Sequence, residues 1–170
     1  VKSAAVQKLI DDMFDTMTEC HGVGLAAPQV HEGIRLFVAS LDAGDDDEDE
    51  GEDAEPQPVV LINPEITVVG TDVVQDWEGC LSIPDLRGKV PRAREIRVRA
   101  RNRHWDWVEI TARDFSARVI QHETDHLDGV LFLDRMKSYE TLTFLDEYPG
   151  RAPKGWLICR CSAPLARSRS

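Results

Sequence analysis

Two histidines, His122 and His126, stand four residues apart, and a glutamate, Glu123, directly follows the first. Residues four apart share one face of a helix, so both imidazoles would project from the same side. Phe115 and Val119 continue this stripe toward the N-terminus with apolar side chains. The stripe predicts a helix whose histidines face the interior of the domain, so the rest of the chain must fold around it.

The apolar spacing predicts two helices. The helix that carries the histidines is expected over about residues 114–127, because Asp114 is a natural N-cap and Gly129 stands just past the end. A second, amphipathic helix is expected over about residues 4–20, with Gly22 as its stop signal. Its apolar stripe recurs at intervals of three and four and consists of Val6, Leu9, Ile10, Met13 and Met17.

Several short runs have the pattern of β-strands. Residues 94–103 alternate apolar and arginine side chains, which is typical of a half-buried strand in an antiparallel sheet. The arginines could form a nucleic-acid surface, but no aromatic residues interleave with them, so a solvated sheet face is favoured. Other strands are expected at residues 35–39, 59–62, 65–69 and 105–111. Together these patterns predict an α+β fold, with antiparallel β-sheets packed around the central histidine-bearing helix and a further helix at the N-terminus.

Length and charge predict a single domain with one unusual loop. In a chain of 170 residues we expect one domain over residues 1–150 and a poorly ordered tail over residues 151–170. The formal net charge is −11, and nine acidic residues between positions 45 and 55 account for all but two of these charges. Such a dense acidic block predicts a disordered surface loop over residues 42–57. No apolar run is long enough to span a membrane, so no membrane association is expected.

The histidine pair favours a metal site. Two imidazoles and a carboxylate buried on one stripe would be costly without compensation, and a bound metal ion supplies it. The alternative is a pair of core histidines satisfied by hydrogen bonds. Metalloproteases with this motif often take a third ligand a short way downstream, but Phe132 stands where the long pattern has its last histidine. The residues alone leave several third ligands open: Cys80, Glu140, Glu147 and the remaining cysteines, Cys20, Cys159 and Cys161.

Two further segments are unusual in composition. Cys80 lies within residues 77–84, where Gly79 allows the backbone to approach a ligand closely. The opposing interpretation is that a lone cysteine is usually a buried packing residue. Residues 22–30 are small, apolar and turn-rich, and Gln29 is their only side chain with both a donor and an acceptor. Their Gly-x-Gly pair lacks the third glycine of a dinucleotide-binding fingerprint.

Taken together, the three segments resemble peptide deformylase. That family carries G-φ-G-φ-A-A-x-Q, then E-G-C-L-S, then Q-H-E-x-D-H, in this order. Here the motifs stand at residues 22–29, 78–82 and 121–126, and the resemblance runs from about residue 6 to residue 137. It implies a single metallohydrolase domain that removes the N-formyl group from the N-terminal methionine of newly synthesised proteins and releases formate.

The resemblance also implies roles for individual residues. Glu123 would accept a proton and return it to the leaving amine. The side-chain amide of Gln29 and the backbone N–H of Leu81 would stabilise the oxyanion, and Glu78 and Arg92 would form a supporting ion pair. The ligands of one divalent metal ion, with water as the fourth ligand, would be Cys80, His122 and His126.

The resemblance extends to substrate, metal and location. Fe²⁺ is the metal expected in vivo, and Zn²⁺, Ni²⁺ or Co²⁺ can occupy a site of one thiolate and two imidazoles. The expected partners are formyl-methionyl nascent peptides and, beyond them, the ribosome, with no direct reading of nucleic acid. The expected location is the bacterial cytoplasm, or an organelle if a transit peptide has been removed. Residues expected to line the methionine pocket, pair with the peptide as an added strand or lie at the pocket mouth are Val23, Gly24, Gly79, Phe115, Arg118 and Val119.

Two other functions stay open. A zinc endopeptidase would cleave internal peptide bonds and would use a glutamate as its third ligand. A degenerate, non-catalytic binding module is disfavoured, because every expected catalytic residue is present.

Overall fold

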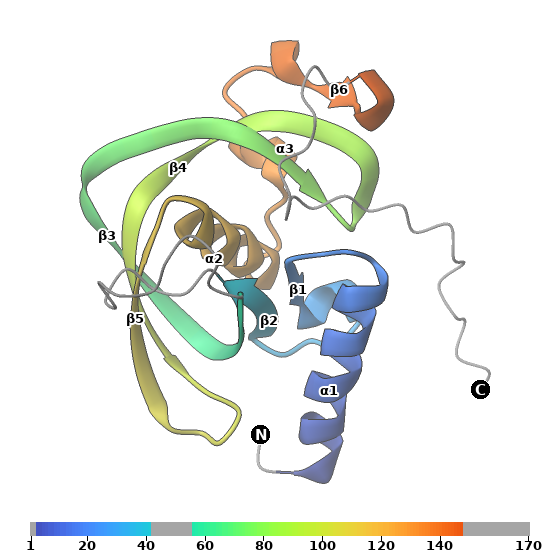
Figure 1. Cartoon of the computed structure of the whole chain (residues 1–170), viewed down its shortest axis with the longest axis vertical. Helices are drawn as coiled ribbons and strands as arrows, with labels where there is room; N and C mark the ends of the chain where they lie inside the picture. Colours follow the sequence, from blue (N-terminus) through green and yellow to red (C-terminus); the bar gives the residue numbers. More distant parts are fainter. Residues whose placement is uncertain (1–2, 42–55, 148–170) are drawn as a thin grey trace.

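The computed structural model describes residues 3–41 and 56–147 (Figure 1). Its helices are α1 (Ala4–Glu19), α2 (Asp114–Leu127) and the short α3 (Phe132–Arg135), with 3₁₀ turns at Ala27–Val30, Tyr139–Thr141 and Leu145–Glu147. Its strands are β1 (Gly24–Ala26), β2 (Leu36–Leu41), β3 (Gln57–Cys80), β4 (Ile83–Arg101), β5 (Trp107–Arg113) and β6 (Thr143–Phe144). None of the helices in these two ranges is long and apolar enough to cross a membrane. The predicted tail and all but the last two residues of the predicted acidic loop lie outside the described residues.

The strands form one antiparallel sheet in the order β1-β2-β3-β4-β5, with β6 paired to β4. The long hairpin of β3 and β4 dominates it, and its register shifts after Ile62, after Val69 and after Gly79. Bulges increase local twist and bend a strand, so this hairpin can curl. Figure 1 shows β3 and β4 arching over α2, which places the helix inside the curve of the sheet.

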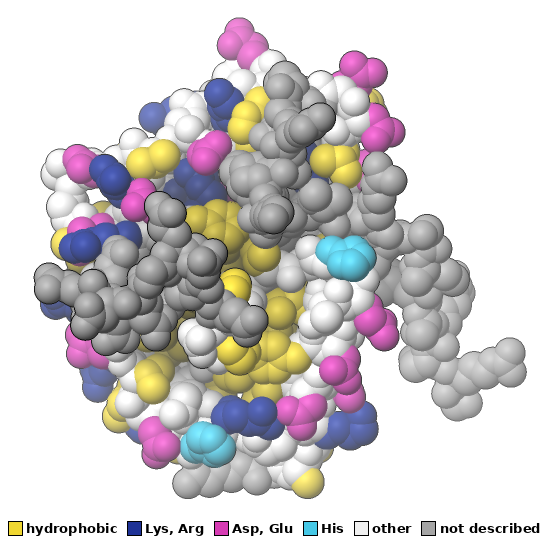
Figure 2. Space-filling model, in the orientation of Figure 1, with side chains coloured by type: hydrophobic (Ala, Val, Ile, Leu, Met, Phe, Trp, Pro, Cys, Tyr) yellow, Lys and Arg dark blue, Asp and Glu magenta, His cyan; other side chains and the backbone are white. Residues whose placement is uncertain are grey.

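The core lies between the concave face of the sheet and α2. Ile96, Val98 and Ala100 of β4 are buried there against Val119 and Ile120 of α2. A second cluster joins α1 to β1 and β2 and includes the predicted stripe residues Ile10, Met13 and Met17. The predicted α+β fold with a central helix and an N-terminal helix is confirmed. Figure 2 shows the molecule from the same side as Figure 1. Hydrophobic side chains gather along the middle of the visible surface, and charged side chains surround them.

Both predicted helices are present, and one predicted cap is wrong. Ser3 caps α1, since the Val6 N–H donates to Ser3 Oγ at 3.4 Å. The N-cap of α2 is Arg113 rather than Asp114. Asp114 instead accepts from Arg94 Nε at 3.0 Å, so a strand of the sheet supplies the partner that the helix backbone was expected to supply.

The predicted strands are present but are not separate. Residues 59–62 and 65–69 both belong to β3, because the Asn63-Pro64 step is absorbed as a register shift and does not end the strand. The alternation in β4 is confirmed, with arginines on the outer face. Contrary to expectation, an aromatic residue does lie among them: Trp107 of β5 stacks under Arg99 and Arg101 at 4.1 and 3.7 Å from its ring centroid. Adjacent strands bring these side chains together, so the linear sequence does not show the contact.

Candidate metal centre and active site

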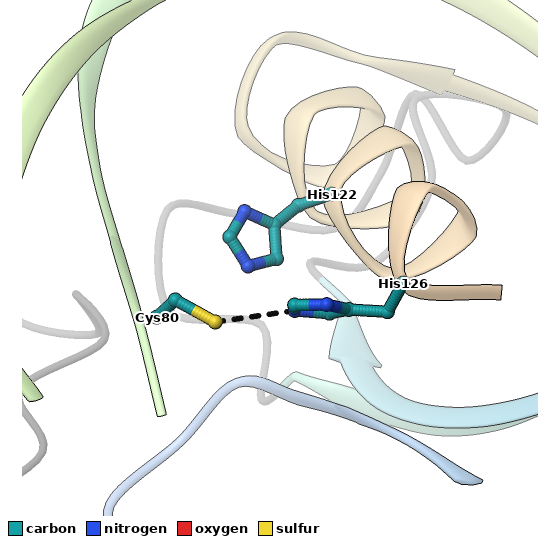
Figure 3. Close-up of side chains that lie close together, drawn as sticks. All are labelled: Cys80, His122 and His126. Carbon is teal, nitrogen blue, oxygen red and sulfur yellow. Dashed lines mark hydrogen bonds between the residues drawn. The ribbon is translucent and has the colours of Figure 1, made fainter. Parts of the chain in front are cut away.

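Three side chains from two elements converge in the interior (Figure 3). Cys80 is the last residue of β3, and His122 and His126 lie on consecutive turns of α2. Their ligand atoms all lie within 4.8 Å of one another, and all three residues are buried. In the part of the chain that the structure describes, no other cluster of histidine, cysteine and acidic side chains has this geometry.

Hydrogen bonds set the orientation of the two imidazoles. His122 is 3% exposed, and its Nδ1–H donates to Glu78 Oε2 at 3.0 Å, which leaves Nε2 available to a ligand. His126 Nε2 lies 3.2 Å from Cys80 Sγ. The rings meet edge to face, with centroids 4.9 Å apart and planes at 81°. Metal-binding histidines usually give their second N–H to a carboxylate or carbonyl in this way.

The charges of the cluster suit a cation. Burial opposes ionisation of the Cys80 thiol, but hydrogen bonds and charge from His122 and His126 outweigh it and lower its pKa to about 5. Burial likewise opposes protonation of His122, but the sulfur and Glu78 outweigh it and raise the pKa of His122 to about 10. A metal ion can take the place of the proton that Cys80 and His122 share, because a metal ion binds thiolate and neutral imidazole. One thiolate and two imidazoles also leave a fourth position open, as catalytic sites require.

Glu123 is a buried acid beside these ligands. It is 1% exposed, and its Oε2 atom has no hydrogen-bond partner among the described residues. Burial outweighs the attraction of the histidines and raises the pKa of Glu123 to about 7. Gly24 of β1 makes room for this side chain, because a Cβ there would overlap the Glu123 carboxylate. A buried carboxylate oxygen without a donor is costly, so its presence next to a metal cluster indicates a functional group.

The turn after β1 brings Gln29 to the sulfur of Cys80. Gln29 Oε1 accepts from the Ala26 N–H at 2.8 Å, which fixes the amide with its NH₂ end toward the cluster. Its Nε2 donates to Ser82 Oγ at 3.1 Å and lies 3.8 Å from Cys80 Sγ. Leu81 connects Cys80 to Ser82, whose N–H donates to the same sulfur at 3.4 Å. Both predicted oxyanion donors therefore belong to segments that meet at the Cys80 side of the cluster.

Five of the six predicted substrate residues lie close to this cluster, in the adjoining core or at its edge. Gly24 faces Glu123, and Gly79 directly precedes Cys80. Val119 is buried in the core between α2 and the sheet, and Val23 and Phe115 pack against that core while staying half-buried. Half-buried apolar side chains at a core edge can line a pocket for an unbranched apolar side chain.

Arg118 does not lie where it was expected, and two of the open candidates for the third ligand lie away from the cluster. Arg118 is 6% exposed and donates to Glu78 and to two strand carbonyls, so it is an interior residue and does not lie at a pocket mouth. It is one helical turn before His122 on the inward face, and periodicity alone should have placed it inside. Glu140 and Glu147 are exposed and are not part of the ligand cluster, so neither supplies the third ligand.

The predicted Glu78–Arg92 pair is confirmed, and it continues further than predicted. Arg92 donates to both oxygens of Glu78, from Nε at 2.9 Å and from Nη2 at 3.0 Å. Its Nη1 donates to Asp125 at 2.6 Å, and Arg135 donates to both oxygens of Asp125 at 3.1 and 2.6 Å. The sequence held one signal for this extension, which was Asp125. It is an acid on the inward half of the helix, and a buried acid needs a cationic partner.

Comparison with known proteins decides what this cluster belongs to. The family model described as Polypeptide deformylase matches residues 1–141. The chain belongs to the peptide deformylase family. The resemblance seen in the three motifs is thereby confirmed. The protein is a metal-dependent hydrolase that removes the N-formyl group from the N-terminal methionine of newly synthesised proteins, with release of formate.

The chain matches individual relatives over most of their length. The chain is 42% identical to peptide deformylase 2 of Nostoc sp. over 148 residues, covering 87% of this chain and 81% of the relative. It is 48% identical to a peptide deformylase of Salinibacter ruber over 136 residues, covering 79% and 70%. Among solved structures, the Met-Ala-Ser-bound class I type b peptide deformylase of Acinetobacter baumannii superposes with a TM-score of 0.70 at 38% identity, covering 80% of this chain and 84% of that one.

Proposed function

We propose that Cys80, His122 and His126 hold the catalytic metal ion and that Glu123 is the general base of deformylation. The observation that carries this proposal is the pairing of a three-donor cluster with a buried carboxylate whose Oε2 has no partner in the described residues. When bound, the metal ion acts as a Lewis acid that polarises the formyl carbonyl and makes water more acidic.

Glu123 carries the proton through the reaction. Its Oε2 accepts one proton from the attacking water as the oxygen bonds to the formyl carbon. When the C–N bond breaks, the same proton passes to the departing amine, so that formate and a free N-terminus result. A carboxyl with a pKa of about 7 can both accept and return a proton near neutral pH.

Gln29 and Leu81 stabilise the negative charge that develops on the formyl oxygen. The Gln29 amide is already oriented, because the Ala26 N–H holds its oxygen and leaves its NH₂ group toward Cys80. The second donor is the backbone N–H of Leu81. Each donor of this kind contributes about 3 kcal/mol in the transition state of comparable enzymes.

The substrate adds to the sheet as a further strand. β1 stands at one end of the strand order in the described sheet, so its outer edge can pair with an extended peptide. Val23 and Gly24 on this edge and Gly79 opposite would bond to the peptide backbone. Phe115 and Val119, together with Val23, would form the apolar pocket for the methionine side chain.

The metal in vivo is proposed to be Fe²⁺, and Zn²⁺, Ni²⁺ or Co²⁺ would also fit a thiolate and two imidazoles. Formyl-methionyl peptides arise on the ribosome, so we extend the proposal to nascent chains met there. The location proposed is the bacterial cytoplasm or an organelle, in keeping with relatives from bacteria and from the plant Arabidopsis thaliana. The catalytic unit is proposed to be a single domain over residues 1–150.

Formate release from formyl-Met-Ala-Ser tests the proposal. Protein loaded anaerobically with Fe²⁺ should release formate, and the Glu123→Ala variant should keep its metal without turning over. A peptide blocked by acetyl in place of formyl serves as the matched substrate control. Folded, metal-loaded protein that cleaves internal peptide bonds and releases no formate would favour a zinc endopeptidase instead, although the exposed positions of Glu140 and Glu147 speak against the ligand that such an enzyme needs.

A further inference from the structure

We propose that Arg118 is a positioning residue of the metal centre: it fixes Glu78, and through Glu78 the ring of His122, while it fastens α2 to the β3–β4 hairpin. The proposal rests on the metal site proposed above and adds a residue that touches neither metal nor substrate. Two observations support it, the acceptors that Arg118 reaches and the balance of buried charge around it.

The carboxylate of Glu78 is fully occupied. Oε1 accepts from Arg92 Nε at 2.9 Å and from Arg118 Nη1 at 2.7 Å. Oε2 accepts from Arg92 Nη2 and from His122 Nδ1, each at 3.0 Å. A carboxylate offers about four acceptor positions, so all of them are used. Arg92 and Arg118 thus hold the carboxylate from two directions, and the remaining position is directed at His122.

The same guanidinium bonds to the backbone of both strands of the hairpin. Arg118 Nη1 donates to the Val90 carbonyl of β4 at 2.9 Å, and Nη2 donates to the Val74 carbonyl of β3 at 2.7 Å. Arg118 lies four residues before His122 on α2, and β3 continues from Val74 to Cys80. One side chain therefore links the helix that carries two ligands to the strand that carries the third.

Arg118 also balances the buried charge. The side chains of Glu78, Arg92, Asp125 and Arg118 are 2%, 5%, 9% and 8% exposed, respectively. Two carboxylates are thus matched by two guanidinium groups, with Arg135 at the surface end of the network. Without Arg118 the Glu78 carboxylate would keep only one arginine, and the Val74 and Val90 carbonyls would lose the hydrogen bonds that Arg118 donates. Buried polar groups left in this state are costly, so the local structure would rearrange around His122.

Lysine cannot replace this arginine. The planar guanidinium reaches three acceptors at fixed angles, whereas an ammonium group is a single point on a flexible stem. Arg118→Lys keeps the charge and loses the geometry, while Arg118→Met loses both and keeps a similar length. We therefore expect metal affinity to fall in the order parent, Arg118→Lys, Arg118→Met, with the last about 10–100-fold weaker, the usual effect of disturbing a group that supports a ligating histidine.

The test has three readouts. They are the Zn²⁺ affinity from competition with a chelator, the NMR signal of the His122 Nδ1–H, and the kinetics on formyl-Met-Ala-Ser. Arg97→Met is the matched control, because Arg97 is a surface arginine of β4 whose carboxylate neighbour lies 3.8 Å away. The proposal expects Arg118→Met to lose affinity and the sharp Nδ1–H signal, with KM within about twofold of parent, and Arg97→Met to match parent.

Three results would overturn it. Unchanged affinity and Nδ1–H signal in Arg118→Met would show that Glu78 and Arg92 suffice. A raised KM with unchanged affinity would return Arg118 to the substrate site. If Arg118→Met does not fold, Arg118→Lys decides alone, and parent-like affinity in that folded variant would refute the need for the guanidinium geometry. A parent protein that binds no metal would instead refute the proposed metal site itself.

Discussion

Gly24→Ala should slow catalysis by pushing Glu123, the proposed general base, out of place. A Cβ built on Gly24 would lie 2.7 Å from Cδ and 2.8 Å from Cγ of Glu123, whereas ordinary contact begins at 3.4 Å. Glu123 Oε1 would lie nearer still, so Glu123 or β1 must shift by at least about 0.7 Å, and displacements near 1 Å at a reacting group cost on the order of 100-fold. We expect kcat to fall about 10–100-fold, equivalent to roughly 1.4–2.7 kcal/mol.

The assay separates this effect from substrate binding and from folding. The backbone groups of residue 24 remain in the variant, so KM for formyl-Met-Ala-Ser should stay within about twofold, and metal content should equal that of the parent. Gly33→Ala is the matched control, because a Cβ there meets nothing within 4 Å and its backbone angle suits alanine. A Gly24→Ala protein with the kcat of the parent would refute the argument that β1 and Glu123 are fitted to each other.

Three further outcomes are expected. Glu123→Ala should retain the metal by elemental analysis and lose at least about 100-fold in kcat, so near-parental turnover would exclude Glu123 as the base. Cys80→Ala should fail to retain metal through gel filtration, and full occupancy would point to another third ligand. In metal-free protein the Cys80 thiol should ionise with a midpoint near pH 5, because its pKa is lowered; the thiolate absorbance should persist down to that pH and vanish below it. A midpoint above about pH 8, the range of a free cysteine, would contradict the proposed charge pairing with His122 and His126.

The parts of the fold that sequence could predict are those set by local periodicity. The inward stripe of α2 and the alternation of β4 are properties of neighbouring residues, and both are found as expected. The continuity of β3 could not be predicted, because a register shift turns the Asn63-Pro64 step from a strand end into a bulge only when β4 is there to pair with. For the same reason, the contact of Trp107 with the arginines of β4 could not be predicted, because it exists only once β4 and β5 pair.

The site residues also fall into those that local geometry predicts and those that depend on contacts between distant elements. His122 and His126 are four residues apart, so helix geometry alone brings them together. Cys80 comes from another element, and the residues by themselves could not choose it over Glu140 or Glu147. Only the family resemblance singled it out. Arg118 shows the opposite error: its position one turn before His122 on the inward face was visible, but the residue was expected at the pocket mouth, because most arginines reach the surface.

Two buried glutamates show how one small interior can serve two purposes. Glu78 and Glu123 are 3% and 1% exposed, so burial opposes the ionisation of each. For Glu78, hydrogen bonds from His122 and Arg92 outweigh burial and hold its pKa well below the usual range. For Glu123, burial prevails and raises the pKa to about 7, while Oε2 has no partner among the described residues.

Environments that separate two carboxyl pKa values separate their roles. A carboxylate whose acceptor positions are all filled can orient a neighbour but cannot accept a proton near neutral pH. The carboxylate whose Oε2 has no partner among the described residues is the one proposed to react, and the filled acceptor positions of Glu78 hold His122 in place beside it.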